Sequence, residues 1–186
     1  MFKEKTAYEV AWRLVGSERC RRDRPEIRTG ITVIDGVHDN DFDPIEIVSL
    51  QSSLANRGIT VDFMGMPTGF GGFRRTTSAD RLELLESKLR QAGSFVVISP
   101  REPYSIAEKG LVRRFVDKGG RLLLISDPSR TQQINTLAEE FGLSFQPGFL
   151  YNQVDYDLNH RNIFVQDFSD DPVTEGLSRV VFYTAG

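Results

Sequence analysis

The stretch SFVVISPREPYSIAEKGLVRRFVDKGGRLLLISD, Ser94 to Asp127, decides the fold. Two apolar runs, 95–98 and 122–125, are too short for helices and show no alternation, which is typical of strands buried on both faces of a parallel sheet. The segment between them ends at Gly119-Gly120 and is helical in pattern. Its apolar face is expected to hold Ile106, Leu111, Phe115 and Val116. Together these elements predict one right-handed βαβ unit.

The same alternation of strand and helix extends on both sides of this unit. Strands are predicted at Ile31–Asp35 and Ile59–Phe63, which gives four strands with the two above. The other helices are expected to turn these residues inward: Ile47, Leu50 and Leu54 after an Asp43-Pro44 start; Leu82, Leu85 and Leu89 after a Ser78 cap, ending at Gly93; and Ile134, Leu137, Ala138 and Phe141 before Gly142. This order predicts a flavodoxin-like three-layer α/β/α sandwich with a mainly parallel sheet.

The two ends of the chain follow other patterns. Residues 1–28 combine a short amphipathic helix, Thr6 to Gly16, with a charged linker, and we expect the helix to cover a sheet face or edge. Residues 29–186 are expected to form the α/β domain. Its last part contains three short strand-like runs, 145–149, 163–165 and 179–183, without helices between them. They predict an antiparallel or mixed extension at one edge of the sheet.

Composition excludes several classes of protein. A net charge of −3 provides no basic field of the kind that nucleic-acid binding requires. The single cysteine, Cys20, excludes an intramolecular disulfide and a multi-cysteine metal site. No apolar run reaches the roughly 20 residues of a membrane span, and no signal-peptide core opens the chain. We expect a soluble domain with no cofactor; these features favour the cytoplasm but leave the compartment open.

Polar residues that follow the strands define the candidate site, because ligands of such folds bind outside the carboxyl ends of the strands. The turn from Asp35 to Asp43 is the richest of them. Its carboxylates and one histidine suit turn capping, contact with a ligand through His38, or weakly a metal, since DNDFD lacks the glycine and glutamate spacing of a calcium loop. The candidate crevice residues are Asp35, His38, Asn40, Ser99, Glu102, Tyr104 and Asp127.

Catalytic motifs are weak by comparison. Glu102 could serve as a general acid or base, but no partner is apparent in the sequence; its neighbour Ser105 could instead cap a helix that Glu108 supports. The glycine-rich loop, Gly65 to Thr77, has neither GxGxxG nor GxxxxGK[ST] spacing, so it carries no nucleotide fingerprint. Ser99 and Ser126 end strands, but the prolines that follow leave no nucleophile elbow.

The order of these motifs resembles the class I glutamine-amidotransferase-like superfamily. The resemblance covers about Thr29 to the C-terminus and rests on the following runs: IDGVHDN from Ile34, ISP from Ile98, FVDKGGRLLL from Phe115, FGL from Phe141 and DPVTEGL from Asp171. The chain is most similar to non-catalytic members: a domain-of-unknown-function family, accessory domains of gliding-motility-type ABC transporters, and a relative in intraflagellar-transport proteins. The cysteine elbow of the true amidotransferases is missing, so no catalytic residue transfers.

Three functions remain open from the sequence. The first is a non-catalytic domain that binds a small polar ligand or a protein partner, which is what the resemblance implies. The second is a hydrolase with Glu102, Asp35 or His38 as its general base. The third is a structural module of a larger transport assembly associated with a membrane, such as an ABC-transporter system. No nucleic acid, metal or membrane span within this chain is expected in any of them, although the third function predicts flanking membrane helices in the full protein.

Overall fold

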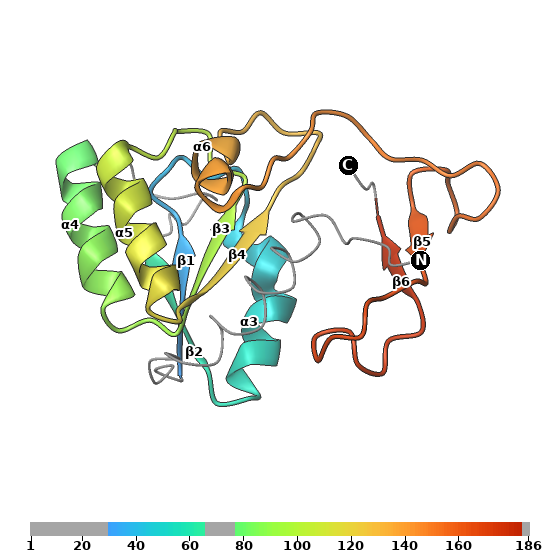
Figure 1. The fold of residues 1–186 in the computed structure, drawn as a ribbon, viewed down its shortest axis with the longest axis horizontal. Coiled ribbons are helices and arrows are strands. Elements are labelled where there is room, and N and C mark those ends of the chain that lie inside the picture. Colours follow the sequence, from blue (N-terminus) through green and yellow to red (C-terminus); the bar gives the residue numbers. More distant parts are fainter. Residues whose placement is uncertain (1–29, 66–76, 184–186) are drawn as a thin grey trace, which may run out of the picture.

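The computed structural model describes residues 30–65 and 77–183, and in these ranges it confirms the predicted fold class. A four-stranded parallel sheet in the order β2-β1-β3-β4 lies between helices (Figure 1). Its strands are β1 (Ile31–Asp35), β2 (Thr60–Met64), β3 (Ser94–Ile98) and β4 (Arg121–Ile125). All three pairings are parallel, and β1 and β3 are central, so the carboxyl ends of both strands open at the same edge of the sheet.

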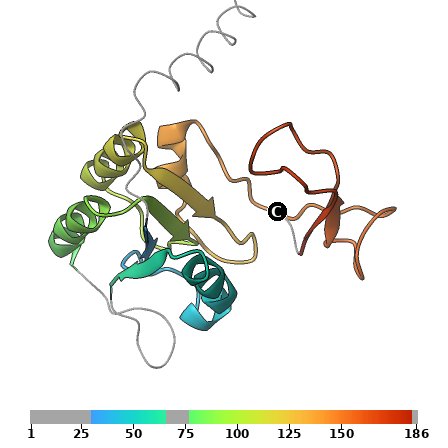
Figure 2. The same cartoon turned by 90° about the horizontal axis from the view of Figure 1, so that it is seen from below.

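The helices lie on both sides of the sheet. Figure 2 shows α4 and α5 on one side and α3 on the other. The helical elements are η1 (Pro44–Ile47), α3 (Val48–Ala55), α4 (Ser78–Leu89), α5 (Ile106–Asp117), α6 (Asn135–Ala138) and η2 (Glu139–Phe141). The predicted helix after Asp43 therefore begins as a 3₁₀ turn, and α4 ends at Leu89, before the predicted stop at Gly93.

Local capping explains where these helices begin. Asp43 is the predicted N-cap, and Ser105 with Glu108 forms the predicted capping box. Asp43 also forms a capping box, with Glu46, which was not predicted. At α4 the cap is Thr77 rather than Ser78, because the Thr77 side chain accepts the hydrogen bond from the Asp80 backbone N–H. A one-residue error of this kind is expected where two hydroxyl residues adjoin.

Two hydrophobic clusters hold the layers together. The larger one contains Phe95, Leu85, Val112 and Leu137, and it joins β1, β2 and β3 to α4, α5 and α6. The smaller contains Ile34, Phe42, Val96 and Ile98 on the opposite face of the sheet, with Ile47 packed against it. The inward placement of Ile134, Leu137 and Ala138 is confirmed, and Phe141 is partly buried. Leu50 and Leu54 in α3 are only partly buried.

Two expectations about the central βαβ unit are wrong. The run at β4 is not buried on both faces, because β4 is an edge strand in which Leu123 and Ile125 are exposed. On α5, Ile106 is 85% exposed. The buried face of α5 consists instead of Glu108, Val112 and Phe115, with Leu111 and Val116 partly buried. At the start of α5, the charged Glu108 is thus buried in place of Ile106, which was predicted to face the core.

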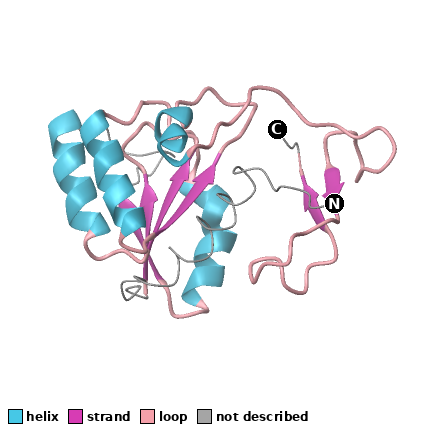
Figure 3. Ribbon diagram, viewed as in Figure 1, coloured by secondary structure: helices cyan, strands magenta, loops and turns pink. Residues whose placement is uncertain are grey.

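The C-terminal strands form a separate small sheet. β5 (Ile163–Val165) pairs antiparallel with β6 (Val180–Phe182), and Figure 3 shows this pair apart from the parallel sheet. These two strands were predicted, but their attachment to an edge of the main sheet was not correct. The strand expected at 145–149 is irregular. The pairing edge of β4 therefore remains free of a fifth strand in the described part of the chain.

Two predicted features lie outside the described residues: the N-terminal helix with its linker, and most of the glycine-rich loop. Among the helices that are described, none has the length and apolar character needed to cross a membrane.

Candidate functional site

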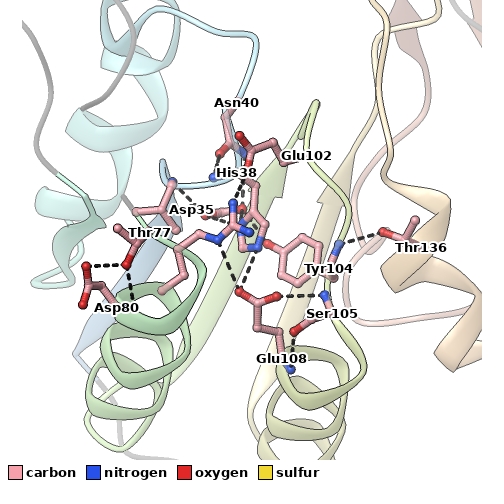
Figure 4. A network of polar contacts seen from close by, with 12 residues as sticks. Asp35, His38, Asn40, Thr77, Asp80, Glu102, Tyr104, Ser105, Glu108 and Thr136 are labelled. Carbon is pink, nitrogen blue, oxygen red and sulfur yellow. Dashed lines mark hydrogen bonds and ion pairs between the residues drawn. The ribbon is translucent and has the colours of Figure 1, made fainter. Parts of the chain in front are cut away.

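The carboxyl ends of β1 and β3 bring five of the predicted residues together. Figure 4 shows Asp35, His38, Asn40 and Tyr104 of this cluster. Asp35 is the last residue of β1, and Tyr104 lies just before α5. Both side chains are buried, and so are the other three members of the cluster, His38, Asn40 and Ser99. Two backbone positions are left-handed, with φ of 49° at Asp39 and 37° at Ser99. This conformation lets the turn after β1 fold back over the end of β3.

His38 is the centre of the cluster and is fully buried. Its Nδ1 atom lies 2.9 Å from Asp35 Oδ2, and its Nε2 atom lies 3.3 Å from Glu108 Oε1. The Tyr104 ring stacks on the imidazole with a centroid separation of 3.8 Å. Both ring nitrogens therefore face carboxylates, and one face of the ring is covered by the tyrosine. This environment stabilises the doubly protonated imidazolium.

The Asp35 carboxylate receives hydrogen bonds from several directions. Tyr104 Oη donates to Asp35 Oδ2 at 2.5 Å, and the Val37 backbone N–H donates to Oδ1 at 3.2 Å. Asn40 Nδ2 donates to the Ile98 carbonyl at 2.9 Å and to Asp35 Oδ2 at 3.3 Å, so it fastens the end of β1 to the end of β3. These contacts leave the carboxylate satisfied without a ligand.

Two residues that the site prediction did not include complete the cluster. Arg81 on α4 is buried, pairs with Glu102, and places its Nε atom 3.7 Å from Glu108 Oε1. Glu108 accepts a hydrogen bond from the Ser105 backbone N–H at 2.8 Å through its other oxygen. Glu108 therefore caps α5 and neutralises His38 at the same time. The charges tie β1, α4 and α5 to one another.

The pKa values follow from burial opposed by these partners. Burial alone lowers the pKa of His38, but the charge and hydrogen bond of Asp35, helped by Glu108, outweigh it and raise the pKa to about 9. Burial raises the pKa of Glu108, yet hydrogen bonds from His38 and Ser105 bring it down to about 2. The pKa of Asp35 is lowered by His38 despite burial, and the pKa of Tyr104 rises well above its usual value through burial and the Asp35 charge.

The remaining candidates contribute differently. Ser99 takes part through its backbone, since its carbonyl accepts from the Asp41 N–H at 3.0 Å. The Glu102 side chain is 40% exposed and lies at the rim, where it pairs with Arg81. Asp127 is not part of the cluster: it caps its own turn at Ser129 and pairs with Arg130 at 3.0 Å. The end of β4 therefore does not converge on the same place.

Sequence patterns contained a signal for both missed residues. Arg81 lies four and eight residues before Leu85 and Leu89, and Glu108 lies four and seven residues before Val112 and Phe115. Charged residues on the buried stripe of two adjacent helices indicate a buried ion pair. Glu108 had been recognised only as a helix cap, which is confirmed.

The cluster is suited to keeping its groups in fixed charge states rather than to transferring protons. With its pKa raised to about 9, His38 holds both protons near neutral pH and is poorly suited to act as a general base there. In the described ranges, no group of three or more His, Cys, Asp or Glu residues is placed to hold a metal ion. Every buried carboxylate of the cluster faces a cation or a donor.

Comparison with known proteins assigns the fold to a family. No curated protein matches the chain at a significant level. A solved structure described as "mmIFT52 N-terminal domain" matches with a TM-score of 0.58 and 18% identity, and the match covers 82% of this chain and 69% of that one. The family described as the IFT52 GIFT domain matches residues 73–166, about half of the chain, including Arg81, Glu102, Tyr104 and Glu108. The chain belongs to the IFT52 GIFT domain family.

Proposed function

We propose that this chain is a non-catalytic protein-interaction domain that serves an intraflagellar-transport assembly, and that it acts in the cilium. The observation that carries the proposal is the closed cluster at the carboxyl ends of β1 and β3. An enzyme of this fold would present its reactive groups there. In this chain Asp35, His38 and Glu108 are buried and their charges face one another: His38 Nδ1 lies 2.9 Å from Asp35, and Nε2 lies at ion-pair distance, 3.3 Å, from Glu108. The family match favours this assembly over an ABC-transporter system.

The hydrolase alternative receives less support from the geometry. Its base would have to reach a substrate or a water molecule within hydrogen-bond distance. His38 is inaccessible and protonated, and Asp35 already accepts hydrogen bonds from Tyr104, Asn40 and Val37. Of the three candidate bases only Glu102 reaches solvent, and it is paired with Arg81.

An apolar and acidic segment supplies a surface for a partner. Eleven of the sixteen large apolar side chains that are exposed in the described part of the chain lie between Leu143 and Tyr183. Val154, Leu158 and Val173 are each at least 86% exposed. The same segment has six acidic residues and two arginines, and both arginines lie over phenylalanine rings. We infer that its partner is a basic, amphipathic segment of another transport subunit.

The test measures binding of the full chain to each intraflagellar-transport subunit of the same organism by isothermal titration. At least one subunit is expected to bind. A Val154→Asp/Leu158→Asp variant should bind about tenfold or more weakly, since exposed apolar anchors at an interface contribute at least 1.4 kcal/mol together. Ile106→Asp, which alters an equally exposed residue on α5, should leave the affinity unchanged.

Two results would argue against the proposal. One is the absence of binding to every subunit. The other is turnover of an ester, amide or glycoside substrate that is lost in Glu102→Gln, because a reaction that depends on the rim carboxylate belongs to the hydrolase alternative.

A further inference from the structure

One face of the sheet is covered over only part of its width. Leu123 and Ile125 on β4 are 48% and 37% exposed. Their partners in register on β3 are Val96 and Ile98, which are buried in the smaller hydrophobic cluster. Residues paired in register on parallel strands point to the same side of the sheet. The apolar floor of the smaller cluster therefore continues onto β4 and is exposed there.

The topology accounts for this gap. The connection from β1 to β2 carries α3, which packs against β2 on this face. The next two connections place α4 and α5 on the opposite face, and Leu137 of α6 joins the cluster on that same side. The described residues thus leave β4 without a helix on the α3 side. An α/β sheet of this kind is stable when helices cover both faces.

We propose that the N-terminal segment Thr6 to Gly16 docks as a helix on the exposed face of β4, beside α3. In this segment Tyr8, Ala11, Trp12 and Val15 stand at i, i+3, i+4 and i+7, so a helix would present one apolar stripe. A layer one helix wide is what this side of the sheet lacks. The stripe supplies an aromatic and an aliphatic anchor for Leu123 and Ile125.

The linker permits this placement within one chain. Residues 17–29 join the segment to Gly30, immediately before β1, and 13 residues extend to about 43 Å. The distance across the sheet from β1 to β4 is two strand spacings, about 10 Å. A short tether gives the segment an effective concentration in the millimolar range. A strip of two side chains is also far smaller than the roughly 800 Å² per partner of a stable interface between subunits.

Trp12 reports on the docking, because it is the only tryptophan in the chain. In the full chain as a monomer, its emission is expected to be blue-shifted and its quenching by acrylamide severalfold weaker than that of a free indole. Leu123→Asp should shift the emission to that of an exposed tryptophan and restore quenching. Ile106→Asp, which introduces the same charge on the opposite face, should change neither.

A second variant distinguishes the loss of docking from unfolding of the domain. Val15→Asp disrupts the stripe but leaves the sheet intact, so it should expose Trp12 while far-ultraviolet circular dichroism shows a folded domain. Three results would overturn the proposal: an exposed Trp12 in the unaltered chain, protection that Leu123→Asp and Val15→Asp both leave intact, or protection that disappears on dilution. The last would identify a second copy as the occupant.

Discussion

Raising the pH from 6 to 9.5 should destabilise this protein by deprotonating His38. The folded pKa of about 9 lies above the unfolded value of 6.5, so the native state binds more protons than the unfolded state between these two values. The stabilisation is fully present below pH 6.5 and is lost as the pH rises through about 9. At about 1.4 kcal/mol per pKa unit, the shift corresponds to about 3 kcal/mol of unfolding free energy.

Urea denaturation at a series of pH values measures this loss. The midpoint should fall while the m-value stays constant, since the surface exposed on unfolding does not change. His38→Gln should be less stable at pH 6 and should lose most of the pH dependence. His160→Gln provides the matched control, because His160 is the only other histidine and is exposed. The His160→Gln variant should lose as much stability with rising pH as the unaltered chain.

An equal pH dependence in the unaltered chain and in His38→Gln would refute the assignment of this loss to His38. Stability that rises between pH 6.5 and 9 would refute it as well, because it would mean that the native state binds fewer protons. Glu108 makes the opposite prediction at the acid end: its folded pKa of about 2 lies below the unfolded 4.5, so its stabilisation is lost as the pH falls through this range.

Three substitutions give further predictions, each read by the urea midpoint. Tyr104→Phe removes the hydroxyl that donates to Asp35 and should cost about 1.5–3 kcal/mol, whereas Tyr151→Phe, at 68% exposure, should cost nothing measurable. Gly110→Ala within α5 should stabilise by about 0.5–1 kcal/mol, because its new methyl group meets only the flexible end of Arg114. Gly120→Ala should destabilise by about 1–3 kcal/mol, since the methyl group would overlap the Phe115 ring. A neutral Gly120→Ala, a destabilising Gly110→Ala or a neutral Tyr104→Phe would contradict the packing described above.

The sheet was predictable because its signals are local. Strands β1 and β3 are short apolar runs, and the Asp43 and Ser105 caps mark helix starts within three residues. The exposure of β4 was not predictable in this way. In the sequence, an apolar run looks the same whether its strand lies at the centre or at the edge of a sheet. Only the order of the strands in the folded sheet distinguishes the two positions.

The candidate site was half predictable for a similar reason. The rule that parallel strands end at one edge brought Asp35, His38 and Tyr104 together correctly. The rule does not predict that these charges are neutralised, because the partners, Arg81 on α4 and Glu108 on α5, come from the core faces of helices. The spacing of Arg81 and Glu108 places them on the apolar stripes of their helices, but only the three-dimensional packing shows which groups they meet there.

The most direct test of the closed cluster is the protonation state of His38 at pH 7.4, measured by the nitrogen-15 chemical shifts of its imidazole in the His160→Gln variant, where it is the only histidine. The closed cluster predicts an imidazolium with protons on both nitrogens that titrates with a pKa of about 9. A neutral ring at pH 7.4 that titrates near 6.5 would contradict it, and would return His38 to the candidates for a general base.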